Sequence, residues 1–236
     1  MKTLLAIIAT ESDRALVERH WHSYEVLGYD IMGFGTVGAG CVWPEGIKAR
    51  FDTGVMGKRM APCGSVIFDL VRQELEIINV FLNRKEYDVL MICEPDNVFV
   101  RQPPEHPCNG MYLAPILPNY AAPGIFKTSV YFSTPRVMDR KCAERFFPVA
   151  MEMFRNNNVE HHVSDRFPAL VCHTAQIPWM NYPAWSPLPF IWDTADWKEA
   201  WKRDAVTAIR LGACCLHSVK EQWQTELVQE EIQKCQ

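Results

Sequence analysis

The chain opens, over residues 3–34, with TLLAIIATESDRALVERHWHSYEVLGYDIMGF, and this stretch decides the fold class. Residues 3–10 form a continuous apolar run of the kind found in parallel strands that are buried on both faces. The next segment has Ser12 as a suitable N-cap and Gly28 as a suitable C-terminal residue, with apolar residues at helical spacing between them. Residues 29–34 supply a second strand. The opening is therefore a βαβ unit, from which nucleotide-binding sheets are built.

Further strands and helices are predicted along the rest of the chain. Residues 35–64 carry several Gly and Pro, and we expect loops there with one short strand. A helix capped by Ser65 runs to Leu82, and a short apolar strand follows at residues 87–93. Further on, we expect short strands at 111–114 and 129–133, helices at 136–157 and 165–174, a tryptophan- and proline-rich segment at 178–201, and a strand at 213–217.

Composition places the chain among folded single domains and excludes several functions. It has 236 residues, of which 48% are apolar and 22% charged, and no linker-like stretch divides it. The net charge of −4 gives no general attraction to nucleic acid. Nine cysteines without CxxC spacing indicate reduced thiols. No run of about 18 apolar residues exists, and residues 3–10 are short for a secretion signal, so we expect a soluble cytoplasmic protein without membrane attachment.

Acidic residues follow directly after the predicted strand at 87–93, as Glu94-Pro95-Asp96. Open α/β sheets bind their ligands at the carboxyl ends of parallel strands. Pro95 interrupts regular strand pairing, so both carboxylates can face one crevice. Mg²⁺ and Mn²⁺ bind carboxylate oxygens together with substrate phosphates. Taken alone, the motif is equally consistent with a simple turn.

Residues 88–100, DVLMICEPDNVFV, resemble the metal-binding strand and DxD-type motif of GT-A glycosyltransferases. They are most similar to the form found in the plant hydroxyproline arabinosyltransferase and serine galactosyltransferase group. The resemblance implies an α/β, Rossmann-like GT-A fold with a mixed, mostly parallel sheet flanked by helices. It also implies a nucleotide-sugar donor, UDP-linked, bound with Mn²⁺ or Mg²⁺. Residues 1–104 would then bind the donor and residues 105–236 the acceptor.

Two other segments resemble GT-A enzymes in the expected order. Residues 215–220 are similar to the terminal strand whose histidine completes the metal shell, which implies His217 as a metal ligand and Lys220 as a contact to the diphosphate. Residues 9–12 are similar to the first strand-to-helix turn, which implies that Ala9, Thr10 and Glu11 contact the nucleoside. Taken singly, His217 has the alternative of a structural histidine and Lys220 that of a surface charge.

The central motif also departs from the resembled pattern. Glu94 replaces the usual first aspartate, so Asp96 is the better-supported metal ligand, and Glu94 and Pro95 complete the donor-binding motif. Glu94 has the alternative of facing the ribose or a water. Asn97 stands where the plant group often has histidine. Details of donor and acceptor therefore do not transfer from that group.

Asp165 lies at the start of the helix predicted at 165–174. In GT-A enzymes a carboxylate at such a helix start lies beside the acceptor, which implies that Asp165 is a catalytic base or orients the acceptor. Its alternative role is to cap the helix. The acceptor is a hydroxyl, with hydroxymethylated DNA bases, proteins and glycans as candidates, since viral and bacterial transferases of this size act on all three. The oligomeric state is not predicted.

A glycine-rich segment supports a different class of protein. Residues 33–38, GFGTVG, match the GxGxxG pattern of dinucleotide-binding proteins and follow a predicted strand. The pattern requires a helix at its third glycine, and Pro44 follows closely instead. The alternatives to a transferase are an NAD-dependent oxidoreductase that uses this loop and a non-catalytic nucleotide-binding domain.

Overall fold

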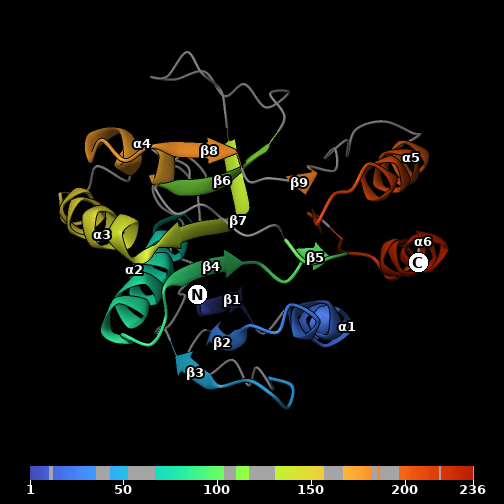
Figure 1. Cartoon of the computed structure of the whole chain (residues 1–236), viewed down its shortest axis with the longest axis horizontal. Helices are drawn as coiled ribbons and strands as arrows, with labels where there is room; N and C mark the ends of the chain where they lie inside the picture. Colours follow the sequence, from blue (N-terminus) through green and yellow to red (C-terminus); the bar gives the residue numbers. More distant parts are fainter. Residues whose placement is uncertain are drawn as a thin grey trace.

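A mixed seven-stranded sheet lies at the centre of the computed structural model (Figure 1). The structure describes residues 1–10, 13–35, 43–52, 67–103, 110–116, 131–156, 167–181, 185–186, 197–217 and 219–235. The strand order is β3-β2-β1-β4-β7-β6-β8, and β7 runs antiparallel between two neighbours, while the other pairings are parallel. The strands are β1 (Thr3–Ala9), β2 (Asp30–Gly35), β3 (Ala49–Asp52), β4 (Val89–Cys93), β6 (Met111–Ile116), β7 (Tyr131–Asp139) and β8 (Trp179–Asn181). The predicted mixed, mostly parallel sheet is confirmed.

Helices cover both faces of this sheet. Helices α2 (Ile67–Asn83), α3 (Arg140–Arg155) and α4 (Phe167–Thr174) lie on one side, and α1 (Arg14–Glu25) lies on the other (Figure 1). Leu4, Ala6 and Ile8 of β1 pack in the core beneath α2 and α3, whereas Leu5 and Ile7 pack beneath α1. Because both faces are covered, β1 is apolar at successive positions rather than at alternate ones.

A small second sheet and two helices form the C-terminal side of the molecule (Figure 1). The sheet contains β5 (Val98–Phe99), β10 (Cys215–Leu216) and β9 (Trp185–Ser186), with β10 in the middle. Helices α5 (Trp197–Arg210) and α6 (Gln222–Cys235) pack on each other around a separate apolar cluster. The strand predicted at 213–217 is present over Cys215–Leu216, where it pairs with β5 and β9.

Helices α5 and α6 were not predicted from the sequence. Trp197 and Trp201 lie on one face of α5, and both contact Trp223 of α6. The Trp197–Trp223 ring centroids are 5.9 Å apart in a tilted arrangement, and those of Trp201 and Trp223 are 5.3 Å apart edge to face. The end of the predicted tryptophan- and proline-rich segment, from Trp197 onward, is therefore part of an amphipathic helix. Tryptophans four residues apart lie on the same helix face, which was the available signal.

Two element boundaries also differ from the predictions. Residues 136–139 belong to β7 rather than to a helix, because they pair with β4 along their length. Helix α3 begins only at Arg140, where Asp139 Oδ1 accepts a hydrogen bond from Cys142 N at 2.6 Å as an N-cap. The N-cap of α1 is Asp13 rather than Ser12. The predicted cap Ser65 lies outside the described residues, while Gly28 ends the first helical segment with a φ of +66° as expected.

The described residues also bear on the predictions about cysteines and membranes. Cys93, Cys142, Cys172, Cys214, Cys215 and Cys235 are free thiols. Burial raises the pKa of the Cys172 thiol to about 12 and also raises that of Cys142 to about 12, so both behave as small apolar side chains. Across the described ranges, no helix combines the length and apolar character needed to cross a membrane.

Candidate metal and donor site

The motif Glu94-Pro95-Asp96 forms a tight turn at the carboxyl end of β4. Asn97 N donates a hydrogen bond to Glu94 O at 3.1 Å, and Pro95 occupies the second position, where its fixed φ suits the turn. The Asn97 side chain is fully buried; its Oδ1 accepts from Glu94 N at 2.9 Å, and its Nδ2 donates to Thr134 O at 3.0 Å. The turn is therefore closed internally and anchored to β7.

Pairing between β5 and β10 brings the C-terminal residues to this turn. β5 follows the turn directly, and its antiparallel pairing with β10 places His217 one residue beyond the paired strand. Val219 N then donates a hydrogen bond to Asp96 O at 3.1 Å. Side-chain ligand atoms of Glu94, Asp96 and His217 consequently lie within 4.8 Å of one another.

Asp96 is the central carboxylate of this group and is only 7% exposed. Its Oδ1 lies 3.6 Å from His217 Nε2, and its Oδ2 lies 3.4 Å from Lys220 Nζ. Among the described residues, Oδ1 has no hydrogen-bond partner. A buried carboxylate oxygen without a partner is costly, whereas a bound cation would satisfy it. The donor set of carboxylates and imidazole therefore fits a divalent metal ion.

The two remaining ligand candidates are held in place by their own contacts. Glu94 Oε2 accepts a hydrogen bond from Thr134 Oγ1 at 3.2 Å and lies 3.9 Å from His217 Nε2. Burial disfavours the charged form of His217, but the carboxylates of Asp96 and Glu94 outweigh it and raise the pKa of His217. The site thus attracts positive charge to the space beside the two carboxylates.

A cleft of about 260 Å³ opens beside this turn. It is lined by Ile8, Thr10, Asp13, Leu16, Glu94, Pro95, Asp96 and Lys220. Asp13 Oδ2 accepts hydrogen bonds from Thr10 N at 2.8 Å and from Thr10 Oγ1 at 2.7 Å, which shapes the β1-to-α1 turn. The cleft therefore joins the end of β1, the start of α1 and the end of β4, where open α/β sheets bind ligands.

The structure brings most of the predicted site residues together. Thr10, Glu94, Pro95, Asp96 and Lys220 line the cleft, and His217 is buried against the two carboxylates. The side chain of Ala9 is instead fully buried in the core under α1, so only its backbone is available to a nucleoside. Glu11 and Asp165 lie outside the described residues.

The sequence did not predict the roles of Asp13, which lines the cleft, or of His20 and Tyr24 of α1, which contact the turn. Asp13 stands three residues after Thr10, a spacing at which a carboxylate commonly bonds to the backbone of a turn, so a signal was present. His20 and Tyr24 bond to the backbone of the Glu94–Asn97 turn. No local sequence pattern predicts these contacts, because they join residues that are distant in the chain.

Gly33, the first glycine of the dinucleotide-like pattern, has a packing role in the structure. A Cβ atom at this position would collide with the Trp43 indole and with Ile47, so the ring occupies the space that glycine leaves. Residues 36–42, which hold the rest of the pattern, lie outside the described residues. The glycine is accounted for by close packing against Trp43.

The layered sheet and its strand order define an α/β protein with the architecture of GT-A glycosyltransferases. In particular, the chain is similar to galactosyltransferase LgtC, solved in complex with donor and acceptor sugar analogues, with a TM-score of 0.51 over 98% of this chain and 95% of that chain. The two sequences are 11% identical, so the likeness concerns the fold. The sequence matches no protein-family model and no curated protein sequence. The predicted fold class is confirmed, while the likeness to the plant arabinosyltransferase and galactosyltransferase group stays a prediction.

Proposed function

We propose that this protein is a metal-dependent glycosyltransferase that moves a sugar from a UDP-linked donor to a hydroxyl acceptor. One observation carries the proposal: the buried Asp96 carboxylate, with an unbonded oxygen beside His217, opens on a cleft at the carboxyl end of a parallel strand. The fold shared with a galactosyltransferase supports the same chemistry.

Asp96, His217 and Glu94 are the residues that would hold the metal. Mn²⁺ suits this set better than Mg²⁺, because Mg²⁺ is bound almost entirely by oxygen whereas an imidazole is present here. When bound, the cation supplies neutralisation of the charge on the leaving nucleoside diphosphate. Lys220, 43% exposed and 3.4 Å from Asp96 Oδ2, extends the positive side of the cleft and stabilises the same charge.

The β1-to-α1 turn would bind the nucleoside. Thr10 and Asp13 line the cleft beside Ile8 and Leu16, so a polar edge and an apolar wall face the same space. Ala9, through its backbone, and Glu11 are the other residues that we propose for nucleoside binding. Residues 1–104 would thus form most of the donor half.

Residues 105–236 would provide most of the acceptor half. Asp165 is the proposed base or orienting residue for the acceptor hydroxyl. The acceptor would be a hydroxymethylated DNA base or a hydroxyl of a protein or glycan. Salt-sensitive binding to duplex DNA separates the first of these from the others, because phosphate contacts weaken with salt. A lack of binding at low salt would remove the DNA acceptor.

The decisive experiment is a screen of nucleotide sugars for Mn²⁺-dependent hydrolysis, read as release of nucleoside diphosphate. We expect activity with a UDP-sugar and abolition of that activity by Asp96→Ala. Full activity is expected in Glu86→Ala, the matched control, whose exposed carboxylate precedes the amino-terminal end of β4 whereas Asp96 follows its carboxyl end. Full activity in Asp96→Ala would refute the assignment. Calorimetry with UDP plus Mn²⁺ against NAD tests the nucleotide-binding and oxidoreductase alternatives, and tight binding of NAD without binding of UDP would overturn the proposal.

A further inference from the structure

Two polar side chains of α1 that are not part of the cleft lining contact the backbone of the Glu94–Asn97 turn. His20 Nδ1 lies 2.7 Å from Pro95 O. The Tyr24 hydroxyl, which has a single proton to donate, lies 3.1 Å from Pro95 O and 3.0 Å from Asn97 O and shares that proton between them. Both side chains are buried, at 2% and 0% exposure, and stand four residues apart on one face of the helix.

The partners of His20 decide its tautomer. A carbonyl oxygen only accepts, so Nδ1 must carry the proton that is donated to Pro95 O. Nε2 is then the acceptor, and the Thr225 hydroxyl of α6 lies 3.0 Å from it, closer than that hydroxyl lies to Glu221 O at 3.4 Å. Burial lowers the pKa of His20, in keeping with a neutral ring. The ring therefore connects α6 to the turn in one defined orientation.

The carbonyl that both side chains hold belongs to the peptide bond between Pro95 and Asp96. A peptide unit is planar, so fixing its oxygen also fixes the direction in which the chain enters the next residue. We propose that His20 and Tyr24 are positioning residues that lock this peptide plane and so aim the Asp96 carboxylate at the metal. This inference rests on the proposed function, because it assumes that Asp96 binds a cation.

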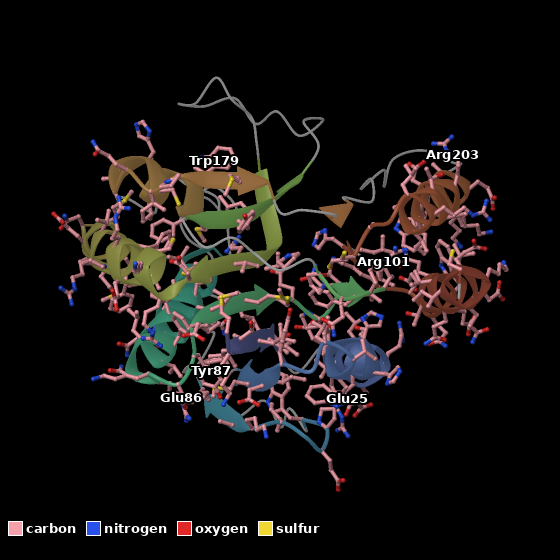
Figure 2. All side chains as sticks on the ribbon, viewed as in Figure 1. Glu25, Glu86, Tyr87, Arg101, Trp179 and Arg203 are labelled. Atoms are coloured by element: carbon pink, nitrogen blue, oxygen red, sulfur yellow. The ribbon has the colours of Figure 1, made fainter. Side chains whose placement is uncertain are left out.

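Two substitutions of His20 distinguish the hydrogen bond to Pro95 O from the space that the imidazole ring fills. An asparagine in place of His20 would present an amide N–H at the position of Nδ1, whereas a glutamine would present one at the position of Nε2. His20→Asn therefore keeps the bond to Pro95 O and His20→Gln loses it. Alanine is less informative, because His20 lines a pocket of about 380 Å³ from which water would reach the carbonyl; Arg101, labelled in Figure 2, is also part of its lining.

Mn²⁺ binding to the full chain, measured as loss of the free-ion electron paramagnetic resonance signal, tests the proposal. Partners that orient metal ligands from outside typically change metal affinity 10–100-fold, and we expect about a tenfold loss for His20→Gln, since it holds the backbone rather than the ligand itself. His20→Asn should stay within about threefold of the wild type. Tyr24→Phe is a second, independent variant and should also weaken binding. Ser23→Ala, on the same helix turn, is the matched control and should bind as the wild type does.

The outcomes separate this inference from the proposed function. Wild-type affinity in both His20→Gln and Tyr24→Phe would overturn the positioning role and leave the metal site intact. Equal losses in His20→Asn and His20→Gln, tracking a fall in melting temperature, would also overturn it, because a structural role predicts no rescue by asparagine. A wild-type protein that does not bind Mn²⁺ would refute the proposed function and the inference together.

Discussion

Replacing Asp96 with asparagine should leave the metal-free protein folded while removing its thermal response to Mn²⁺. The substitution keeps the shape of the side chain and removes its charge. Two effects oppose each other in the metal-free protein. Lys220, 3.4 Å away, loses the attraction of the Asp96 carboxylate, and the unbonded buried oxygen no longer carries charge. Each is worth about 1–3 kcal/mol, so we expect the free energy of unfolding to change by about 1 kcal/mol or less.

Binding of Mn²⁺ should change the stability of the folded protein by more than the substitution does. A ligand present at 100 times its Kd stabilises the folded state by about 2.7 kcal/mol. For a chain of this size, about 1 kcal/mol moves the melting temperature by about 2–4 °C, so saturating Mn²⁺ should raise that of the wild type by about 5–10 °C. Asp96→Asn should shift by less than about 2 °C.

Differential scanning calorimetry with an Mn²⁺ titration, reversed by EDTA, measures both quantities in one experiment. Glu86→Gln serves as the control, since its carboxylate is exposed and pairs only with Arg84 among the contacts described. The reasoning fails if Asp96→Asn keeps the full Mn²⁺ shift. It also fails if the variant does not fold, since that would make Asp96 a structural residue.

Three further predictions concern the framework around the site. The pKa of Asp30 is lowered, chiefly through its hydrogen bond with Lys2 and also through that with Tyr87. The ionised carboxylate therefore stabilises the folded state fully above the ordinary pKa of 3.8, and this stabilisation is lost as the pH falls through the lowered pKa. Urea unfolding should show Asp30→Asn less stable than the wild type at pH 7 and equal to it in strong acid. Arg140 donates to four backbone carbonyls at the end of α2 and in the turn after it, so Arg140→Met should cost about 2–4 kcal/mol in urea unfolding and Arg140→Lys less. Gly33→Ala should cost about 1–3 kcal/mol by crowding the Trp43 indole, and a smaller side chain at position 43 should restore part of that loss; an unchanged midpoint in Gly33→Ala would contradict the packing assignment.

Local patterns in the sequence were sufficient for the central part of the fold. The apolar run of β1, the periodicity of α1 and the Gly28 stop predicted the opening βαβ unit, and each is present. These signals work because a strand covered on both faces is apolar at every position, and because the buried face of a helix recurs every three to four residues. The turn at Glu94–Asn97 was equally visible, since Pro95 and the flanking polar residues favour a turn at the end of a buried strand.

The same local patterns did not predict the boundary between β7 and α3 or the elements at the periphery of the fold. Residues 136–139 read as the start of a helix, but pairing with β4 made them the end of β7. Helix α5 was not predicted because its first residues belong to the tryptophan- and proline-rich segment at 178–201, which resembles an irregular segment. Helix α6 contains no proline and was also not predicted; in the structure its Trp223 contacts Trp201 of α5. Edge strand β8 likewise shows Trp179 exposed at 41%, a position that composition alone would bury (Figure 2).

The sequence by itself determined that two carboxylates stand at the end of a buried strand and that a histidine and a lysine follow near the C-terminus. Only the tertiary structure decided that Asp96, His217 and Lys220 meet, because the pairing of β5 with β10 and the bond from Val219 N to Asp96 O join segments that are distant in the chain. The contacts of His20 and Tyr24 with Pro95 O likewise join distant segments and depend on the tertiary structure. Periodicity encodes which face of an element is buried, whereas the partner it meets depends on how the whole chain closes, and that information is not local.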